Sequence, residues 1–163
     1  MLSLNAQTWQ QLGIDMDGEA AYDYSGYSVS HSADGSTVAI GATTNDGNGL
    51  QAGHVRIYKW GGSAWTQQGA DIDGEAAGDF SGQSVSLSAD GSTVAIGAHR
   101  NALDAGHVRI YYWGGTSWQK LGADIDGEAA GTYSGYSVSL SADGSTVAIG
   151  ATDNDGGGTN AGH

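Results

Sequence analysis

The chain has 163 residues, with 29 Gly, no Pro and no Cys, and 39% of its residues are apolar. This composition fits one domain rich in turns and short strands rather than long helices. With 18 acidic residues against 5 Lys and Arg, the formal net charge is −13, which opposes binding to nucleic acid and to anionic membrane surfaces.

Two kinds of targeting segment have no counterpart in the sequence pattern. No apolar run reaches the roughly 18 residues that a membrane-spanning helix requires, so we expect no membrane insertion. The first residues, MLSLNAQTWQQ, lack the charged and apolar regions of a signal peptide. The letters themselves therefore leave the cellular location open.

Internal repetition is the strongest signal in the sequence. The stretch SADGSTVAIGA occurs unchanged at residues 32–42, 88–98 and 141–151. The copies are offset by 56 and then 53 residues, and the difference falls in one loop, at 43–51 in the first unit and 99–104 in the second. Such a period predicts an array of similar structural units, so we treat residues 1–163 as one domain with three repeats.

Each unit is predicted to contain four short strands. In the second unit they cover, in chain order, residues 81–88, 92–98, 106–113 and 118–126. In the first of these, Gln83, Val85 and Leu87 share one side and serines share the other, the period-two alternation of a strand. Residues 89–91, ADG, predict a tight hairpin turn in which Gly supplies a positive φ.

Repeated four-stranded units predict an all-β fold, a β-propeller in which each repeat is one blade. The first two strands of a unit are dominated by Ser, Gly and Ala, as expected where twisted sheets crowd toward a central axis. Trp occurs only in the two outer strands, joined there by Tyr58, Tyr111 and Tyr112, where more space must be filled.

These residues also resemble a known family. SGQSVSLS followed by STVAIGA is similar to the FG-GAP repeat of the integrin α-subunit propeller, with Ser81–Gly82 at the FG position and Gly97–Ala98 at the GAP position. The resemblance implies a noncatalytic binding or adhesion module with an extracellular location.

One departure from that family concerns calcium. Many FG-GAP repeats resemble calcium-binding proteins because the loop between their first two strands carries several carboxylates. Here the loop is SADGS with a single carboxylate, Asp34, Asp90 or Asp143. Calcium takes six to eight oxygen ligands, so we do not carry the family's calcium site over, and we expect no cofactor.

The two ends of the sequence match the interior of a repeat. If Trp9 is matched to Trp65, residues 1–4 correspond to the back half of a third strand, while residues 161–163, AGH, repeat its beginning at 52–54. We therefore expect the segment 1–9 to complete the blade that begins at the C-terminus. Such strand complementation removes an exposed sheet edge.

Blade number decides which chain supplies that segment. Propellers have about four to eight blades, so the three blades of one chain are too few to close a ring, whereas two chains supply six. The leading architecture is a head-to-tail homodimer in which each N-terminal segment completes the last blade of its partner. Two alternatives remain: a monomeric, pseudo-threefold, β-trefoil-like fold, and a piece of a longer repeat array.

Acidic residues gather on one predicted face, which carries 15 of the 18 acids in the loops after the second and fourth strands. Hard oxygen ligands there favour a calcium-type cation site, and the candidate ligands are Asp71, Asp73, Glu75 and Asp79. The alternative, which we favour, is a solvated acidic rim that keeps a Gly-rich assembly soluble. The stretch DIDGEAAGD does not have the ligand spacing of a metal-binding loop, and the third repeat has Thr132 in place of Asp79.

Aromatic residues bracket the loops between the outer strands. They could form sugar-stacking clefts between blades, as in a lectin, and the candidate residues are Trp60, Trp65, Trp113, Trp118, Tyr58 and Tyr111. The alternative, again favoured, is cross-strand packing, because Trp at regular spacing in a repeat protein is most often a packing anchor.

Catalytic motifs are missing from the sequence, so we expect a protein that is not an enzyme. Arg56 and Arg109 are expected to pair with nearby carboxylates, and His54, His107 and His163 to make structural hydrogen bonds or to bind metal. Two functional hypotheses stay open: a binding or adhesion module with a glycan or protein ligand, and a self-assembling scaffold without a ligand.

Overall fold

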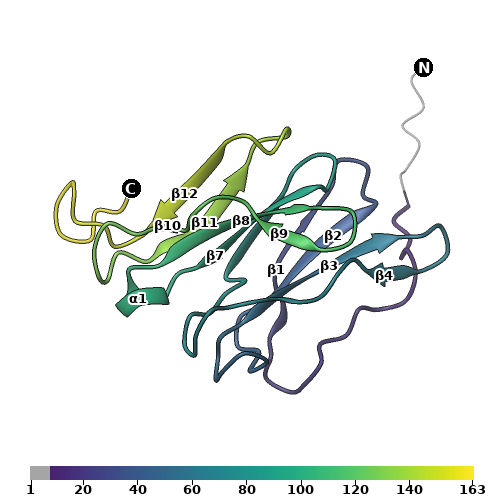
Figure 1. The fold of residues 1–163 in the computed structure, drawn as a ribbon, viewed down its shortest axis with the longest axis horizontal. Coiled ribbons are helices and arrows are strands. Elements are labelled where there is room, and N and C mark those ends of the chain that lie inside the picture. The colour runs from purple at the N-terminus through teal and green to yellow at the C-terminus, as the bar shows by residue number, and fades with distance from the viewer. Residues whose placement is uncertain (1–7) are drawn as a thin grey trace.

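Three antiparallel sheets follow one another along the chain in a computed structural model that describes residues 8–163 (Figure 1). In the first sheet, four strands pair in chain order, and a fifth, short strand also pairs with the third. They are β1 (Ser25–His31), β2 (Thr37–Ala42), β3 (His54–Trp60), β4 (Trp65–Gln67) and β5 (Ile72–Asp73). The strand predicted over residues 1–4 lies outside the described residues.

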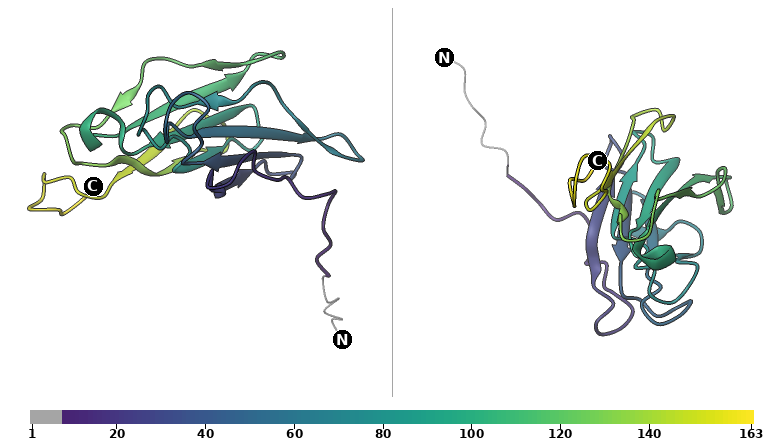
Figure 2. Two further views of the ribbon diagram at one scale, coloured as in Figure 1. Left: turned by 90° about the horizontal axis from the view of Figure 1, so that it is seen from below. Right: turned by 90° about the vertical axis from the view of Figure 1, so that its left-hand side faces the viewer.

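The second sheet repeats this arrangement. Its strands are β6 (Ser84–Leu87), β7 (Thr93–Ala98), β8 (His107–Trp113), β9 (Trp118–Lys120) and β10 (Ile125–Asp126), with β9 and β10 both paired to β8. The third sheet, as far as the chain is described, consists of β11 (Ser134–Leu140) and β12 (Val147–Ala151). The three sheets lie side by side, with the second between the first and the third (Figures 1 and 2).

The expected all-β fold with repeated strand-rich units is confirmed. The described part of the chain contains one helical element, α1 (Asn101–Asp104), in which Ala102 and Leu103 have positive φ angles of 52° and 61°. It is a single distorted turn in the loop after β7. No helix among residues 8–163 is long and apolar enough to cross a membrane. None of the three sheets closes into a barrel or ring.

Two strand predictions need correction. The fourth strand of the second unit, predicted over 118–126, is split into β9 and β10, because Gly122 between them adopts a φ of +77° that a continuous strand does not allow. The first strand begins at Ser84 rather than Ser81, and Ser81 instead makes an isolated parallel bridge to Gly53, just before β3.

The predicted ADG turn is confirmed. Gly91 has a φ of +70°, and the carboxylate of Asp90 accepts hydrogen bonds from the hydroxyls of Ser88 and Ser92 and from the backbone N–H of Ser92. These bonds lower the pKa of Asp90. The same bonds form at Asp34 and Asp143, whose pKa values the neighbouring serines lower to about 2. A turn held by its own side chains accounts for the unchanged letters SADGST in every repeat.

Neighbouring sheets approach one another closely through their first two strands. The hydroxyl of Ser28 donates to the carbonyl of Gly82 at 2.7 Å, and the hydroxyl of Ser84 donates to the carbonyl of Gly135 at 2.8 Å. The backbone also bonds directly, from Ala89 N to the carbonyl of Ala142 at 2.8 Å. The expected crowding of small residues is therefore present, since larger side chains would hold the sheets apart.

The apolar core lies between the first and second sheets. Ala39, Val55 and Ile57 of the first sheet meet residues of β6 and β7, and all members of the cluster are buried. The other members are Ile72, Val85, Leu87, Val94 and Ile96. Val85 and Leu87 face this core, whereas Ser84 and Ser86 bond to the third sheet, so both faces of β6 are covered. Sheet-on-sheet stacking thus follows from the alternation in SVSL.

Replacing Gly97 by Ala should destabilise the fold by about 3 kcal/mol, at the upper end of overpacking costs. A Cβ at Gly97 would overlap the backbone carbonyl of Gly135, which no rotamer change can relieve. Gly61→Ala is the matched control, because a Cβ there meets only the carbonyl oxygen of Ala64 at an ordinary 3.6 Å. Urea unfolding of both variants measures the difference, and equal midpoints would contradict the close approach of the sheets.

Candidate functional site

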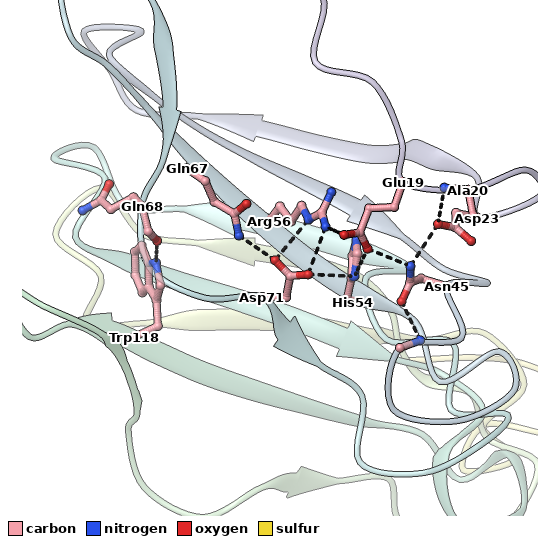
Figure 3. A network of polar contacts seen from close by, with 11 residues as sticks. Glu19, Ala20, Asp23, Asn45, His54, Arg56, Gln67, Gln68, Asp71 and Trp118 are labelled. Carbon is pink, nitrogen blue, oxygen red and sulfur yellow. Dashed lines mark hydrogen bonds and ion pairs between the residues drawn. The ribbon is translucent and has the colours of Figure 1, made fainter.

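An ion-pair network joins β3 to the segment that follows β4 (Figure 3). His54 and Arg56 alternate on β3 and so project from the same face of the strand. Arg56 donates to the carboxylate of Asp71 from Nε at 3.0 Å and from Nη2 at 3.1 Å, and it also pairs with Glu19. Nδ1 of His54 lies 3.7 Å from an oxygen of Asp71. The expected pairing of Arg56 with a carboxylate is confirmed.

The second sheet carries a copy of this network. Arg109 lies 3.2 Å from Asp124 and also pairs with Glu75, which comes from the loop before β6. Lys120 adds a bond to Asp124 at 2.5 Å, at the position where Gln67 donates to Asp71 in the first copy. Each arginine thus links the end of its own sheet's fourth strand to the acidic loop that precedes the sheet.

Both networks hold charged carboxylates at neutral pH. Burial works against ionisation of Asp71, but the hydrogen bonds from Arg56 and Gln67 outweigh it and lower its pKa. Burial also opposes ionisation of Asp124, and Lys120 and Arg109 outweigh it in the same way. At the adjacent His107, burial lowers the pKa and the surrounding aspartates only partly offset it, so this imidazole is neutral.

The candidate metal ligands are distributed over different partners. Asp71 belongs to a cluster with Glu19 and His54, whereas Glu75 belongs to a second cluster with His107 and Asp124. The remaining two candidates have other surroundings. Asp73 lies opposite His54 in the backbone pairing of β5 with β3. Asp79 is buried, and its carboxylate accepts a hydrogen bond from the backbone N–H of Ala76.

Ligand atoms within each cluster lie within 4.8 Å of one another, but an arginine neutralises the carboxylates of each. A divalent cation would have to displace that arginine, and calcium would need more oxygen atoms than either set of three residues supplies. The metal site therefore stays a prediction, and the chemistry visible in each network is that of an internal salt bridge.

The candidate sugar-stacking tryptophans form two pairs. Ring centroids are 5.3 Å apart in the pair Trp60 and Trp65, and 5.5 Å apart in the pair Trp113 and Trp118. Trp65 donates its indole N–H to the carbonyl of Leu12, and Trp118 donates to the carbonyl of Gln68. Each tryptophan is thus bonded to the chain segment that precedes its own sheet in the sequence. Sugar binding by these tryptophans stays a prediction.

The two candidate tyrosines lie on the third strands of their sheets. Tyr58 is opposite Gln67, and Tyr111 packs together with Trp118 against the core cluster that includes Ile72. A shallow hollow of about 230 Å³ lies between Tyr111, Trp118 and the Asp71–Asp73 segment. The structure thus brings Tyr111 and Trp118 together on the second sheet. Trp60 and Trp65 lie on the neighbouring first sheet.

A different cluster of aromatic rings lies between the second and third sheets. His99, directly after β7, contacts Phe80 of its own sheet and two tyrosines that flank the start of β11, Tyr133 and Tyr136. The ring centroids lie 5.8, 5.9 and 5.6 Å from that of His99, respectively. Arg100 places its guanidinium over the Phe80 ring, 4.9 Å from the centroid. These five residues form what we call the His99 cluster.

Two adjoining hollows open beside the His99 cluster. One, of about 460 Å³, is lined by His99, Arg100 and both tyrosines together with Thr152 and Asp153. The other, of about 340 Å³, reaches the first sheet, where its walls include Tyr24, Tyr27, Thr43 and Thr44. Aromatic faces and hydrogen-bonding groups therefore converge on one cleft, the arrangement typical of a small-molecule site.

His99 brings an unpaired polar atom to the cleft. The residue is 8% exposed, and its Nδ1 atom has no hydrogen-bond partner among residues 8–163. Burial, aided by the charge of Arg100, lowers the pKa of His99 to about 4, so the imidazole is neutral at pH 7. A buried polar atom without a partner is costly, and a ligand that bonds to it recovers that cost.

Sequence analysis did not single out the His99 cluster. A usable signal was present, since His99 and Arg100 replace Thr43 and Thr44 of the first repeat and Thr152 and Asp153 of the third. Because the repeats are otherwise so similar, two adjacent residues that differ between them indicate a position that does not serve the packing shared by all repeats. Two of the aromatic partners, Tyr133 and Tyr136, come from the next repeat, so their proximity to His99 could not be read from spacing.

No known family model matches this chain, and no curated protein is significantly similar to it.

Stability should fall as the pH is lowered from about 6.5 toward about 4, because the unfolded state protonates His99 in this range and the folded state does not. Between pH 7 and pH 5 the loss attributable to His99 is about 2 kcal/mol. His99→Thr, which installs the residue of the other two repeats, should remove this slope. Urea unfolding at both pH values tests it, and parallel losses in both proteins would contradict the assigned burial.

Proposed function

We propose that this chain is a noncatalytic binding module of the β-propeller type, and that the cleft at the His99 cluster takes a small carbohydrate. The observation that carries the proposal is the buried, unpartnered Nδ1 of His99 at the floor of an aromatic cleft. Each stacked sheet is one blade in this interpretation, and the resemblance to FG-GAP repeats supports the same class.

The lining of the cleft selects the ligand class. Tyr133 and Tyr136 line the larger hollow and offer rings on which the C–H surface of a pyranose can stack. Arg100, Asp153 and His99 offer donors and acceptors for its hydroxyl groups. The net charge of −13 opposes polyanions, and Arg100 opposes a cationic ligand. A neutral sugar satisfies all three conditions.

The proposal assigns binding rather than catalysis to this cleft. Nδ1 of His99 contacts no hydroxyl or carboxylate among the described residues, so that nitrogen activates no nucleophile and is itself oriented by no acid. Association of two chains through shared blades is part of the same proposal, because it would multiply weak sites on one particle. A ligand-free, self-assembling scaffold is the competing function.

Labelled protein applied to a glycan array should bind a subset of neutral glycans. Tyr136→Ala removes one stacking face and should weaken that binding at least about tenfold, the loss expected for one aromatic contact. Tyr112→Ala is the matched control, since Tyr112 is a partly exposed aromatic residue on β8 away from the cleft.

Other outcomes of the array would overturn the proposal. Loss of glycan binding in Tyr112→Ala with retention in Tyr136→Ala would move the site to the outer strands and their tryptophans. Absence of any glycan signal from the wild-type protein would favour the scaffold.

A further inference from the structure

Each tryptophan that donates across a sheet boundary occupies a defined seat. A seat consists of a backbone carbonyl and the glycine after it, in the segment in front of the sheet. The first seat is Leu12–Gly13, where the indole N–H of Trp65 bonds to the carbonyl of Leu12 at 2.8 Å. A Cβ on Gly13 would lie 2.9 Å from the Trp60 ring, so the glycine is required for the seat to be filled.

The second seat, Gln68–Gly69, is filled in the same way. Trp118 bonds to the carbonyl of Gln68 at 2.7 Å, and a Cβ on Gly69 would lie 2.9 Å from the Trp113 ring. The two glycines have closely similar φ angles, +81° at Gly13 and +85° at Gly69. One contact is therefore built twice, with the same atoms in the same roles.

A third seat, Leu121–Gly122, is formed but empty within the described part of the chain. Gly122 has the same backbone conformation, with a φ of +77°, but no described atom lies within 4 Å of a Cβ placed there. The apolar residue below the seat is uncovered as well: Ile125 is 39% exposed, whereas its counterpart Ile72, which Trp118 and Tyr111 cover, is 7% exposed.

One exposed tryptophan, Trp9, matches this empty seat. Trp9 precedes QQLG as Trp65 precedes TQQG, and it is 90% exposed. Its segment already has the local bonding of the later repeats, because Gln11 donates to Asp15 at 2.8 Å as Gln67 does to Asp71. Trp9 thus has the sequence context and local bonding of the tryptophans that fill the other two seats.

Trp9 cannot reach the third seat of its own chain. Leu12, three residues from Trp9, is held by Trp65 beside the first sheet, whereas Leu121–Gly122 follows β9 and is the corresponding seat two repeats later in the chain. Three residues span at most about 10 Å, whereas two sheet spacings are about 20 Å. A second copy of the chain offers the same Trp9 to this seat.

The outer faces of the stack are complementary in other contacts too. Val29 on β1 is 65% exposed, whereas its counterpart Val85, covered by the preceding sheet, is 8% exposed. On the third sheet, Ser137 and Ser139 stand at the positions where Ser84 and Ser86 bond to the next sheet. His163 already exchanges backbone bonds with Ala151 of β12, at 2.9 and 3.0 Å, beside an otherwise open strand edge.

We infer that Trp9 of a second copy fills the Leu121–Gly122 seat, donates its indole N–H to the carbonyl of Leu121, and covers Ile125. The same contact forms in the reverse direction, so two copies close into a pair with six sheets. This inference rests on the shared-blade part of the proposed function and names the residues that carry it. A closed isologous pair leaves no seat empty and no sheet edge open.

Light scattering should give twice the mass of one 16.5 kDa chain. Trp9→Ala should raise the dissociation constant roughly thirtyfold, as for truncation of an interface tryptophan. Gly122→Ala should dissociate the pair as well, since its Cβ would occupy the position of the indole. Gly62→Ala is the control for backbone strain, because Gly62 also has a positive φ, +92°, and no atom within 4 Å of its Cβ position.

Three outcomes would overturn the inference: a one-chain mass for the wild-type protein, a mass that grows with concentration without a plateau, or equal effects of the Gly122 and Gly62 substitutions. Thermal melts of each variant at low concentration show whether the single chain still folds. Glycan binding at the His99 cluster is measured on the same samples. Retained binding by a protein of one-chain mass would reject the Trp9 contact while leaving the binding proposal intact.

Discussion

Backbone-to-backbone contact between neighbouring sheets is the constraint on which this structure depends. Gly97 lies directly against the carbonyl of Gly135, and Gly41 meets Gly82 in the same way one sheet earlier. At these contact positions the first two strands of a unit carry Gly and Ser, because a larger side chain would hold the sheets apart. The serine hydroxyls then become bonds between sheets, so the small side chains join the sheets as well as permitting their approach.

A stack of sheets held together by the same contact at each boundary has two unlike ends. The proposed pairing of two chains follows from those ends, and the proposed ligand site follows from a boundary between sheets. At the ends, each half of the contact lacks its counterpart among residues 8–163, since the seat at Gly122 is empty and Trp9 is exposed. Between sheets, positions that leave the common packing role are free to vary, and His99 with Arg100 is such a pair. In the proposed account, assembly uses what the repeats share, and ligand binding uses the residues in which they differ.

The sequence predicted the repeating elements well and their mutual contacts poorly. Period-two alternation identified β6, and the ADG letters identified its turn, because both depend on neighbours within a few residues. The sequence pattern does not predict the break between β9 and β10, since a glycine in a strand pattern does not reveal that Gly122 adopts a positive φ. Arg109 was expected to find a carboxylate, but its second partner, Glu75, lies in a loop 34 residues earlier. His99 joins rings from two repeats, a proximity that only the stacking of sheets creates.

Hydrogen exchange along β12 tests most directly whether a second copy completes the third sheet. In a single chain, alternate amides of residues 147–150 point away from β11 toward an open edge and should exchange rapidly, whereas the amide of Ala151 is already bonded to His163. In the closed pair every amide of this strand has a partner or is covered, so protection should become continuous, as on β7, which is paired on both sides. The account predicts this continuous protection at concentrations where the two-chain mass is observed. Alternating fast and slow amides along β12 at the same concentrations would contradict it.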